Sequence, residues 1–242
     1  MKPTLFVSDL HLSPARPQLA AAFDALCAGP SRDAAGLYVL GDLFDAWIGD
    51  DQLREPLAAR VATSLSEVAR AGVPVGIMTG NRDVLLGRRF ADAAGATLLP
   101  EQIVIDLAGT PTLLMHGDEL CTDDVAYQRF RRIARDRGWQ RAFFALPYPL
   151  RARVMGWMRG RSRAATAVKP EYIMDVAAAA VEERFRSANV ARMIHGHTHR
   201  PAHHRLIVDG RQCERWVLAD WYAHGSYLEY DSEGGRTRDI GK

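Results

Sequence analysis

Short apolar runs in this chain are followed, one after another, by acidic, amide or imidazole side chains. Residues 5–7 precede Asp9 and His11, and residues 37–40 precede Asp42. Similar runs end at residues 78, 115 and 194, and the seven polar side chains that follow the five runs are Asp9, His11, Asp42, Asn81, His116, His197 and His199. Open α/β sheets bind ligands beyond the carboxyl ends of their strands. We therefore expect these side chains to meet at one rim of a sheet.

Helical patterns alternate with the apolar runs in the first half of the chain. Apolar residues at helical spacing extend from Leu19 to Leu26 and from Leu57 to Val68. Later apolar runs predict strands at 103–105, 112–115, 192–194, 206–208 and 216–218, with an edge strand at 227–229. Alternating strands and helices of this kind are typical of a layered α/β fold.

A long helical stretch interrupts this alternation. After Asp118 the hydrophobic period is helical for some 65 residues, and the last helix of the stretch is predicted to open at Pro170. We expect an α/β core at residues 1–120 and 188–242. Residues 121–187 are expected to form a helical insertion, or cap, rather than an independent domain.

Length and composition describe an ordinary folded protein. With 242 residues, 48% of them hydrophobic and 25% charged, the chain can bury a large core, and disorder, collagen and coiled coil are excluded. Cys27, Cys121 and Cys213 form no C-x-x-C pair, so neither a disulfide framework nor a zinc knuckle is predicted. No signal peptide is recognised, and no run reaches the roughly 20 apolar residues of a membrane span. We expect a cytoplasmic protein.

Residues 129–163, called the basic segment below, concentrate positive charge. They contain eleven arginines against one acid, Asp136, although the net charge of the whole chain is only +2. Large apolar side chains such as Phe130, Trp139 and Trp157 are interleaved with the arginines. An anionic partner with an apolar part would suit such a segment. A solvated arginine-rich face over an ordinary helical core explains the same pattern equally well.

The side chains expected at the rim suit divalent metal ions. Carboxylate, amide and imidazole ligands without thiolate favour manganese, iron, zinc or cobalt. Seven ligands are too many for one ion, but they suit two ions about 3.5–4 Å apart that share a carboxylate and hold a phosphoryl group. Each short motif alone is more often a capped turn or a surface histidine. Because all five occur in order, each after an apolar run, we predict a metal centre. Glycines that would let the backbone turn sharply beside the ligands are Gly41, Gly80, Gly117 and Gly196.

Taken together, the five motifs resemble those of the calcineurin-like metallophosphoesterases. They are D-x-H at 9–11, G-D at 41–42, G-N-R-D at 80–83, H-G at 116–117 and G-H-x-H at 196–199. The resemblance implies an αββα sandwich with a layered β-sheet core. It also implies that one ion takes Asp9, His11, Asp42 and His199, and the other Asp42, Asn81, His116 and His197. Asp42 would then bridge the two ions.

Longer stretches resemble one group within this family, the UDP-2,3-diacylglucosamine diphosphatases of lipid A biosynthesis. The stretches are residues 41–51, 80–83, 115–124 and 194–201, and the resemblance continues through the insertion. It implies hydrolysis of UDP-2,3-diacylglucosamine to 2,3-diacylglucosamine 1-phosphate and UMP with the help of two divalent ions, Mn²⁺ first among them. It further implies a peripheral protein on the cytoplasmic face of the inner membrane, in contact with its anionic lipid surface. We expect a monomer that does not bind nucleic acid.

The resemblance also assigns roles to single residues. The expected catalytic residues are Asp42, Asn81, Arg82, His116 and His197. The residues expected to contact substrate are Asn81, Arg82, Asp124, Ser162, Thr166, Lys169 and His197. Thr166 departs from the family pattern, which has Asn at that position. Asp124 has an alternative role as the N-cap of a helix that starts near Val125.

Arg82 stands where many relatives carry a histidine that can donate a proton to the leaving group. If an activated water attacks the α-phosphorus, the leaving group is a sugar phosphate, a stable anion that needs little protonation. The permanently charged guanidinium of Arg82 then takes the place of the proton donor. The insertion agrees with the same substrate, because it could cover acyl chains with an apolar inner face and hold anionic lipid with outer arginines.

Two other functions are compatible with the same residues. A metal-dependent nucleic-acid or nucleotide phosphodiesterase would keep the metal centre and use the basic segment to track phosphates. A membrane-surface adaptor with a vestigial metal site would need no activity at all. The adaptor is disfavoured because none of the expected ligands is missing from the sequence.

Overall fold

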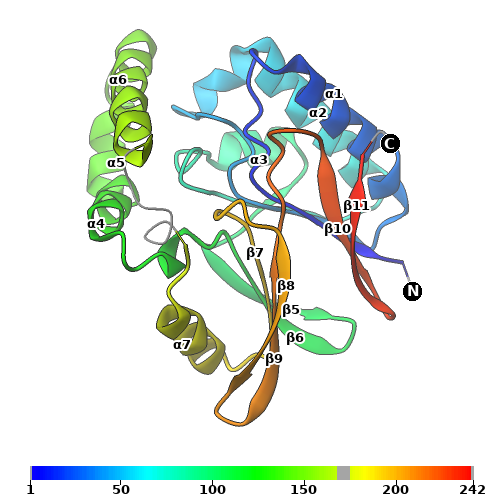
Figure 1. The fold of residues 1–242 in the computed structure, drawn as a ribbon. Coiled ribbons are helices and arrows are strands. Elements are labelled where there is room, and N and C mark those ends of the chain that lie inside the picture. Colours follow the sequence, from blue (N-terminus) through cyan, green and yellow to red (C-terminus); the bar gives the residue numbers. More distant parts are fainter. Residues whose placement is uncertain (1, 168–174, 241–242) are drawn as a thin grey trace.

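Two β-sheets packed face to face form the centre of the protein (Figure 1). The computed structural model describes residues 2–167 and 175–240, and of residues 161–167 only the backbone. The first sheet has the strand order β11-β10-β1-β2-β3-β4, and the second has the order β5-β6-β7-β9-β8. The strands are β1 (Thr4–Val7), β2 (Gly36–Leu40), β3 (Val75–Met78), β4 (Thr97–Leu98), β5 (Gln102–Leu107), β6 (Thr110–Met115), β7 (Arg192–His195), β8 (Ala202–Val208), β9 (Arg211–Val217), β10 (Ser226–Asp231) and β11 (Gly234–Asp239).

Helices cover the outer face of each sheet. Helices α1 (Pro17–Ala28), α2 (Pro56–Arg70) and α3 (Arg88–Ala93) share a buried cluster with β1–β3. Helix α7 (Ala178–Ala188) buries Val181 and Phe185 against the second sheet. Between the sheets, Phe6 and Met78 of the first pack with Ile194 of the second. The layer order is therefore αββα, which confirms the predicted fold class.

Strands β1, β2 and β3 run parallel, so their carboxyl ends point to the same rim. In the second sheet, β6, β7 and β9 are also parallel to one another. Strands β1, β2, β3, β6 and β7 are each followed by predicted ligands within four residues of the strand end. The register of the two sheets thus brings five loops together at one edge of the sandwich, as expected for the ligand-binding crevice of such a fold.

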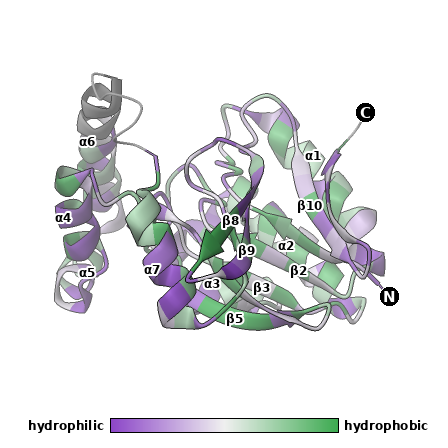
Figure 2. Cartoon of the chain, turned by 60° about the horizontal axis from the view of Figure 1, so that its bottom comes forward, coloured by the Kyte–Doolittle hydropathy of each residue, from purple (hydrophilic) through white to green (hydrophobic). Residues whose placement is uncertain are grey.

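Three helices stand to one side of the sandwich, namely α4 (Val125–Ala134), α5 (Arg137–Phe144) and α6 (Tyr148–Ala167) (Figures 1 and 2). They mix hydrophilic and hydrophobic residues. Phe143 is buried within the cluster under the first sheet, and Trp139 stacks on it with ring centroids 5.2 Å apart. The burial of Phe143 in this cluster attaches α5 to the core. Within residues 2–167 and 175–240, no helix is long and apolar enough to cross a membrane.

The structure differs from the sequence-based expectations in several elements. The predicted insertion, 121–187, includes α7, which nevertheless forms the outer layer on the second sheet. The predicted opening of that helix at Pro170 lies outside the described residues, and the described helix begins at Ala178. The predicted edge strand corresponds to β10, but β11 pairs with it and takes the edge position. The sequence patterns do not predict strands β4 and β11 or helix α3.

Candidate metal centre

Five of the seven predicted ligands have left-handed backbone conformations. The φ angles are 56° at Asp9, 47° at His11, 53° at Asp42, 71° at His197 and 54° at His199. Residues other than glycine rarely adopt positive φ, and such strain of about 1–3 kcal/mol per residue gathers at functional sites. The surrounding hydrogen bonds hold these loops in place. The amide of Asp9 donates to Gly41 O at 3.1 Å, and the amide of His11 donates to Asp42 O at 2.9 Å.

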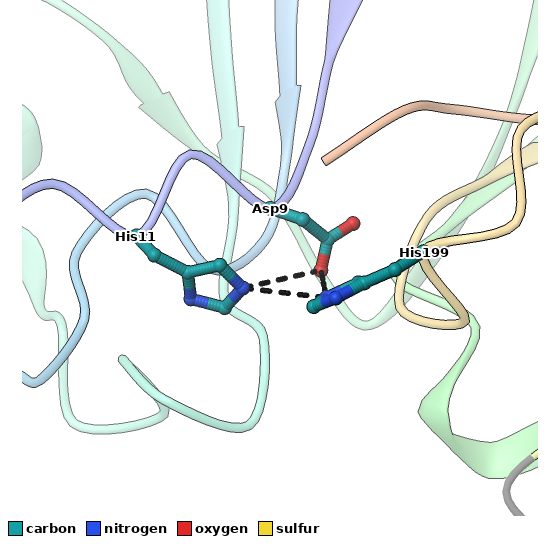
Figure 3. A group of neighbouring side chains, drawn as sticks. All are labelled: Asp9, His11 and His199. Atoms are coloured by element: carbon teal, nitrogen blue, oxygen red, sulfur yellow. Dashed lines mark hydrogen bonds and ion pairs between the residues drawn. The ribbon is translucent and has the colours of Figure 1, made fainter. Parts of the chain in front are cut away.

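Asp9, His11 and His199 point their ligand atoms toward a common point (Figure 3). The Nε2 atoms of His11 and His199 lie 3.3 Å apart. Asp9 Oδ1 lies 3.3 Å from His199 Nε2 and 4.0 Å from His11 Nε2. One carboxylate oxygen and two imidazole nitrogens thus converge, as ligands of one ion do.

A second group of ligand atoms adjoins the first through Asp9. Asp9, Asp42 and His116 also have ligand atoms within 4.8 Å of one another. His116 Nδ1 lies 2.9 Å from Leu40 O, to which it donates, so Nε2 keeps its lone pair for a ligand. Asn81 Oδ1 lies 3.1 Å from His116 Nε2 and 3.0 Å from His197 Nδ1. All seven predicted ligands are therefore gathered in two adjoining groups, with Asp9 in both.

The donor set fits divalent metal. Asp9 Oδ1 and His11 Nδ1 are buried without a hydrogen-bond partner among the described residues, and a buried unpaired group is costly. Burial lowers the pKa of His11 to about 4, and burial together with neighbouring His116 lowers that of His197 to about 4, so both rings are neutral. Burial raises the pKa of Asp42 to about 6, which His116 only partly offsets. A divalent cation would satisfy the unpaired atoms and keep the carboxylates ionised.

Asp83 ties the ligand loops together, a role that the sequence did not reveal. Its carboxylate accepts hydrogen bonds from the amides of Gly80 at 2.7 Å and Leu43 at 2.8 Å. Asp42 Oδ1 in turn accepts from the amide of Arg82 at 2.8 Å. Asp83 is the last residue of the G-N-R-D motif, so the motif marks it as part of the site. Its hydrogen bonds to the other loops cannot be read from the sequence.

Two glycines beside the ligands serve different purposes. Gly41 has a φ of +94°, which the turn after β2 requires. At Gly196 the need is space, because an added Cβ would lie 2.2 Å from Asp9 Oδ2. That oxygen accepts hydrogen bonds from Ser8 Oγ at 2.7 Å and from the amide of His197 at 2.8 Å. The predicted sharp turn is therefore correct at Gly41, whereas close approach explains Gly196.

Only some of the residues predicted to contact substrate have side chains that the structure describes. Arg82 is half-buried, and its charge acts on His11 and Asp42. Asp124 caps α4 by accepting from the amide of Tyr127 at 3.0 Å, which confirms its alternative role, while its substrate contact stays a prediction. The side chains of Ser162 and Thr166 and all of Lys169 lie outside the described residues.

Several arginines of the basic segment bind acids of the core rather than facing outward. Arg131 and Arg135 both contact Asp118, Arg131 at 2.8 Å. Arg151 is buried, pairs with Asp51 and donates to Ile48 O at 2.6 Å, and Arg159 pairs with Asp45. These four arginines therefore bind acids of the core, which the sequence alone did not indicate. Exposed arginines of the segment include Arg129, Arg132, Arg137, Arg141 and Arg153.

Comparisons with known proteins agree with the motifs. Residues 2–201 match the sequence model of the family described as calcineurin-like phosphoesterase. A UDP-2,3-diacylglucosamine hydrolase of Aromatoleum aromaticum is 48% identical over 230 residues, which covers 95% of this chain and 94% of that protein. Another from Cellvibrio japonicus is 47% identical over 231 residues, with 96% of each chain covered. The solved structure of TT1561 of Thermus thermophilus covers 98% of both chains with a TM-score of 0.50 at 11% identity, which indicates a shared fold.

Proposed function

Because this chain belongs to the calcineurin-like phosphoesterases and, within them, to the UDP-2,3-diacylglucosamine hydrolases, we propose that it cleaves the diphosphate of UDP-2,3-diacylglucosamine. The products would be 2,3-diacylglucosamine 1-phosphate and UMP. The chain is a metal-dependent hydrolase. The observation that carries the proposal is the convergence of all seven predicted ligands into two adjoining groups at the rim of the sandwich.

Two divalent ions, Mn²⁺ by preference, are part of the proposal. Asp9, His11, Asp42 and His199 would hold one ion, and Asp42, Asn81, His116 and His197 the other. The ions would lower the pKa of a water and neutralise the charge of the diphosphate. Support for two ions comes from the number of ligand atoms and from their grouping around Asp9 Oδ1 and Asp42 Oδ1.

The charge of Arg82 bears on which phosphorus of the diphosphate is attacked. The backbone amide of Arg82 donates to Asp42 Oδ1 at 2.8 Å, and the positive charge of its guanidinium favours the ionised form of Asp42 and the neutral form of His11. Such a charge stabilises a departing sugar phosphate without transferring a proton. We therefore propose attack at the α-phosphorus, with UMP retaining the oxygen of the attacking water.

The insertion suggests how an amphiphilic substrate is reached. Exposed apolar side chains on α4–α6 include Val125, Phe130, Ile133, Phe144, Leu150 and Trp157. Trp157 is 64% exposed and lies one helical turn from the exposed Arg153. Apolar and cationic side chains on one surface suit an anionic lipid interface. We propose that these helices contact the cytoplasmic face of the inner membrane and receive acyl chains from it.

The direct test is incubation of the protein with UDP-2,3-diacylglucosamine and Mn²⁺. We expect UMP and 2,3-diacylglucosamine 1-phosphate in equal amounts, and no release in the presence of a chelator. Hydrolysis of single-stranded nucleic acid at a higher kcat/KM than the sugar nucleotide would favour a nucleic-acid phosphodiesterase instead. Metal-dependent hydrolysis of a small diester, without hydrolysis of the sugar nucleotide, would overturn the assigned substrate while leaving the enzyme class intact.

A further inference from the structure

A cavity of about 170 Å³ lies beside the metal centre. It is enclosed by the loop after β1, the loop after β2, the start of α2 and helix α6. Two of its lining residues, Leu12 and Phe44, pair in a β-bridge and closely follow the predicted ligands His11 and Asp42 in sequence. The amide of Asp45, another lining residue, donates to Leu12 O at 3.1 Å. The cavity therefore adjoins the place where the reacting phosphoryl group would be held.

The lining combines an apolar wall with hydrogen-bonding groups. Leu12, Phe44 and Leu57 form the apolar part. The polar part comprises the carboxylates of Asp45 and Glu55, the guanidinium of Arg159, and the side chains of Gln52 and Ser13. A pocket of this composition orients a ligand by a few polar contacts while its walls hold an apolar face.

Neighbouring side chains hold the two carboxylates in position. Asp45 pairs with Arg159 of α6, and Glu55 accepts from the hydroxyl of Tyr148. Gln52 Nε2 donates to Ala46 O at 3.3 Å and lies 3.4 Å from Glu55 Oε2. The Glu55 carboxylate can accept further hydrogen bonds, since its two oxygens offer about four lone-pair positions. The cavity thus presents acceptors that are fixed before a ligand arrives.

Charge and size exclude two parts of the proposed substrate from this cavity. The two carboxylates of the lining, Asp45 and Glu55, outnumber its one guanidinium, Arg159, so the lining disfavours a phosphate, and an acyl chain would have to be buried against these charges. Pockets for drug-sized ligands measure roughly 300–1,000 Å³, so a cavity of about 170 Å³ suits a small, compact group rather than two acyl chains. A small neutral group with N–H or O–H donors and an apolar face meets both requirements.

We propose that this cavity binds the pyrimidine nucleoside of the substrate. The inference rests on the proposed function and assigns the nucleoside half of the substrate to the cavity beside the metal centre. One ester oxygen separates the α-phosphorus from the ribose, so attack at that atom requires the nucleoside to lie directly beside the ligands. The imide N–H of uracil and the ribose hydroxyls are donors that suit the oxygens of the Glu55 carboxylate. Discrimination by such fixed acceptors is strong, because an analogue that lacks the donor leaves them unpaired.

Competition by UMP tests the inference. The protein is loaded with Mn²⁺, and inhibition of bis(4-nitrophenyl) phosphate hydrolysis by UMP and by inorganic phosphate is measured. Ser13 lines the cavity and is only half-buried, so Ser13→Phe fills it without entering the core. Ser232→Phe, at an exposed turn, is the matched control. We expect the inhibition constant of UMP to rise roughly 10-fold or more in Ser13→Phe, which corresponds to about 1.4 kcal/mol, and to stay unchanged in Ser232→Phe. The constant of inorganic phosphate should stay unchanged in both.

A second variant keeps the test decisive if Ser13→Phe fails to fold. Glu55→Gln preserves shape and the contact with Tyr148 but removes the charge, and Glu183→Gln on the exposed side of α7 is its control. We expect weaker UMP inhibition in Glu55→Gln alone. Unchanged UMP inhibition in the folded cavity variants would overturn the inference, as would a selective loss of inhibition by 2,3-diacylglucosamine 1-phosphate. Wild-type protein that is inhibited by UMP but does not hydrolyse UDP-2,3-diacylglucosamine would overturn the proposed function only.

Discussion

The ring of Tyr127 stacks on the imidazole of His197, with centroids 5.8 Å apart and planes inclined by 28°. The Tyr127 hydroxyl donates to the buried carboxylate of Asp118 at 2.7 Å. Tyr127 belongs to the first turn of α4, whereas His197 and Asp118 belong to loops of the core. Tyr127 therefore connects helix α4 of the insertion to the metal centre. A change that displaces α4 should also displace the predicted ligand His197.

Replacing Tyr127 separates its two contacts. Tyr127→Phe keeps the ring on His197 but removes a hydrogen bond to a buried charge, so we expect a loss of about 1.5 kcal/mol in the free energy of unfolding. Turnover should stay close to wild type. Tyr127→Ala removes both contacts and should lower kcat as well. Urea unfolding and hydrolysis of UDP-2,3-diacylglucosamine measure the two effects. Equal loss of turnover in both variants would mean that the hydroxyl, not the ring, supports His197.

The proposed assignment of ligands to the two ions predicts unequal effects of ligand removal. Asp42 was assigned to both ions and His11 to one, so Asp42→Ala should reduce turnover more completely than His11→Ala. Metal analysis under saturating Mn²⁺ should give two ions per wild-type chain and fewer in each variant. Fewer than two ions in fully active wild-type protein would contradict the two-ion assignment. Retained turnover in Asp42→Ala would contradict the bridging role.

The metal centre was predictable because its signal is local. Each ligand follows an apolar run, and parallel strands bring the residues after their carboxyl ends to one rim whatever the details of packing. The left-handed backbone at Asp9 and His199 was not predictable, because the single-residue preferences of Asp and His do not require positive φ. The tertiary hydrogen bonds of the loops impose it.

Elements that depend on tertiary pairing escaped prediction. Strand β11 contains two glycines and no apolar residue in its sequence Gly-Gly-Arg-Thr-Arg-Asp, so it has no hydrophobic pattern, and pairing with β10 alone makes it a strand. The arginines of the basic segment look alike in sequence. Only the packing of α6 shows that Arg151 is buried on Asp51 while Arg153 is exposed.

Gly196 leaves no room for a larger residue beside the predicted ligand Asp9. The Cβ of Gly196→Ala would lie 2.1 Å from Ser8 Oγ and 2.2 Å from Asp9 Oδ2, so the Asp9 carboxylate must move. We expect loss of metal affinity and of turnover, by roughly 10- to 100-fold as for other changes that misplace a ligand. Gly156→Ala is the control, because nothing lies within 4 Å of that Cβ in α6. It should raise the free energy of unfolding by roughly 0.5–1 kcal/mol and leave turnover unchanged. Equal metal affinity in Gly196→Ala and wild type would refute this account.

The position of attack can be read from an isotope label. Because Arg82 offers charge without a transferable proton, we expect water to attack the α-phosphorus, so that hydrolysis in heavy-oxygen water labels UMP. Arg82→His should restore a proton donor but lose the fixed charge, and we expect a lower kcat at pH values where the imidazole is neutral. Mass spectrometry of both products determines the label. A labelled sugar phosphate would show attack at the β-phosphorus and would remove the basis for the role of Arg82.

The exposed arginines of the insertion should govern membrane binding separately from catalysis. Arg132, Arg141 and Arg153 are exposed on α4, α5 and α6, unlike Arg151 and Arg159, which bind core acids. Each basic residue near an anionic surface contributes roughly 1 kcal/mol, so reversing all three to Glu should weaken binding to anionic vesicles by roughly 100-fold or more. Hydrolysis of a small soluble diester should stay at the wild-type rate, since the three side chains do not contact the ligand loops. The matched control replaces Arg70, Arg88 and Arg205 with Glu. These arginines lie on the exposed surface of the α/β core, and the change in net charge is the same. If the control weakens vesicle binding as much as the insertion variant does, general charge rather than a defined surface attracts the protein to lipid, and the proposed membrane face of α4–α6 is wrong.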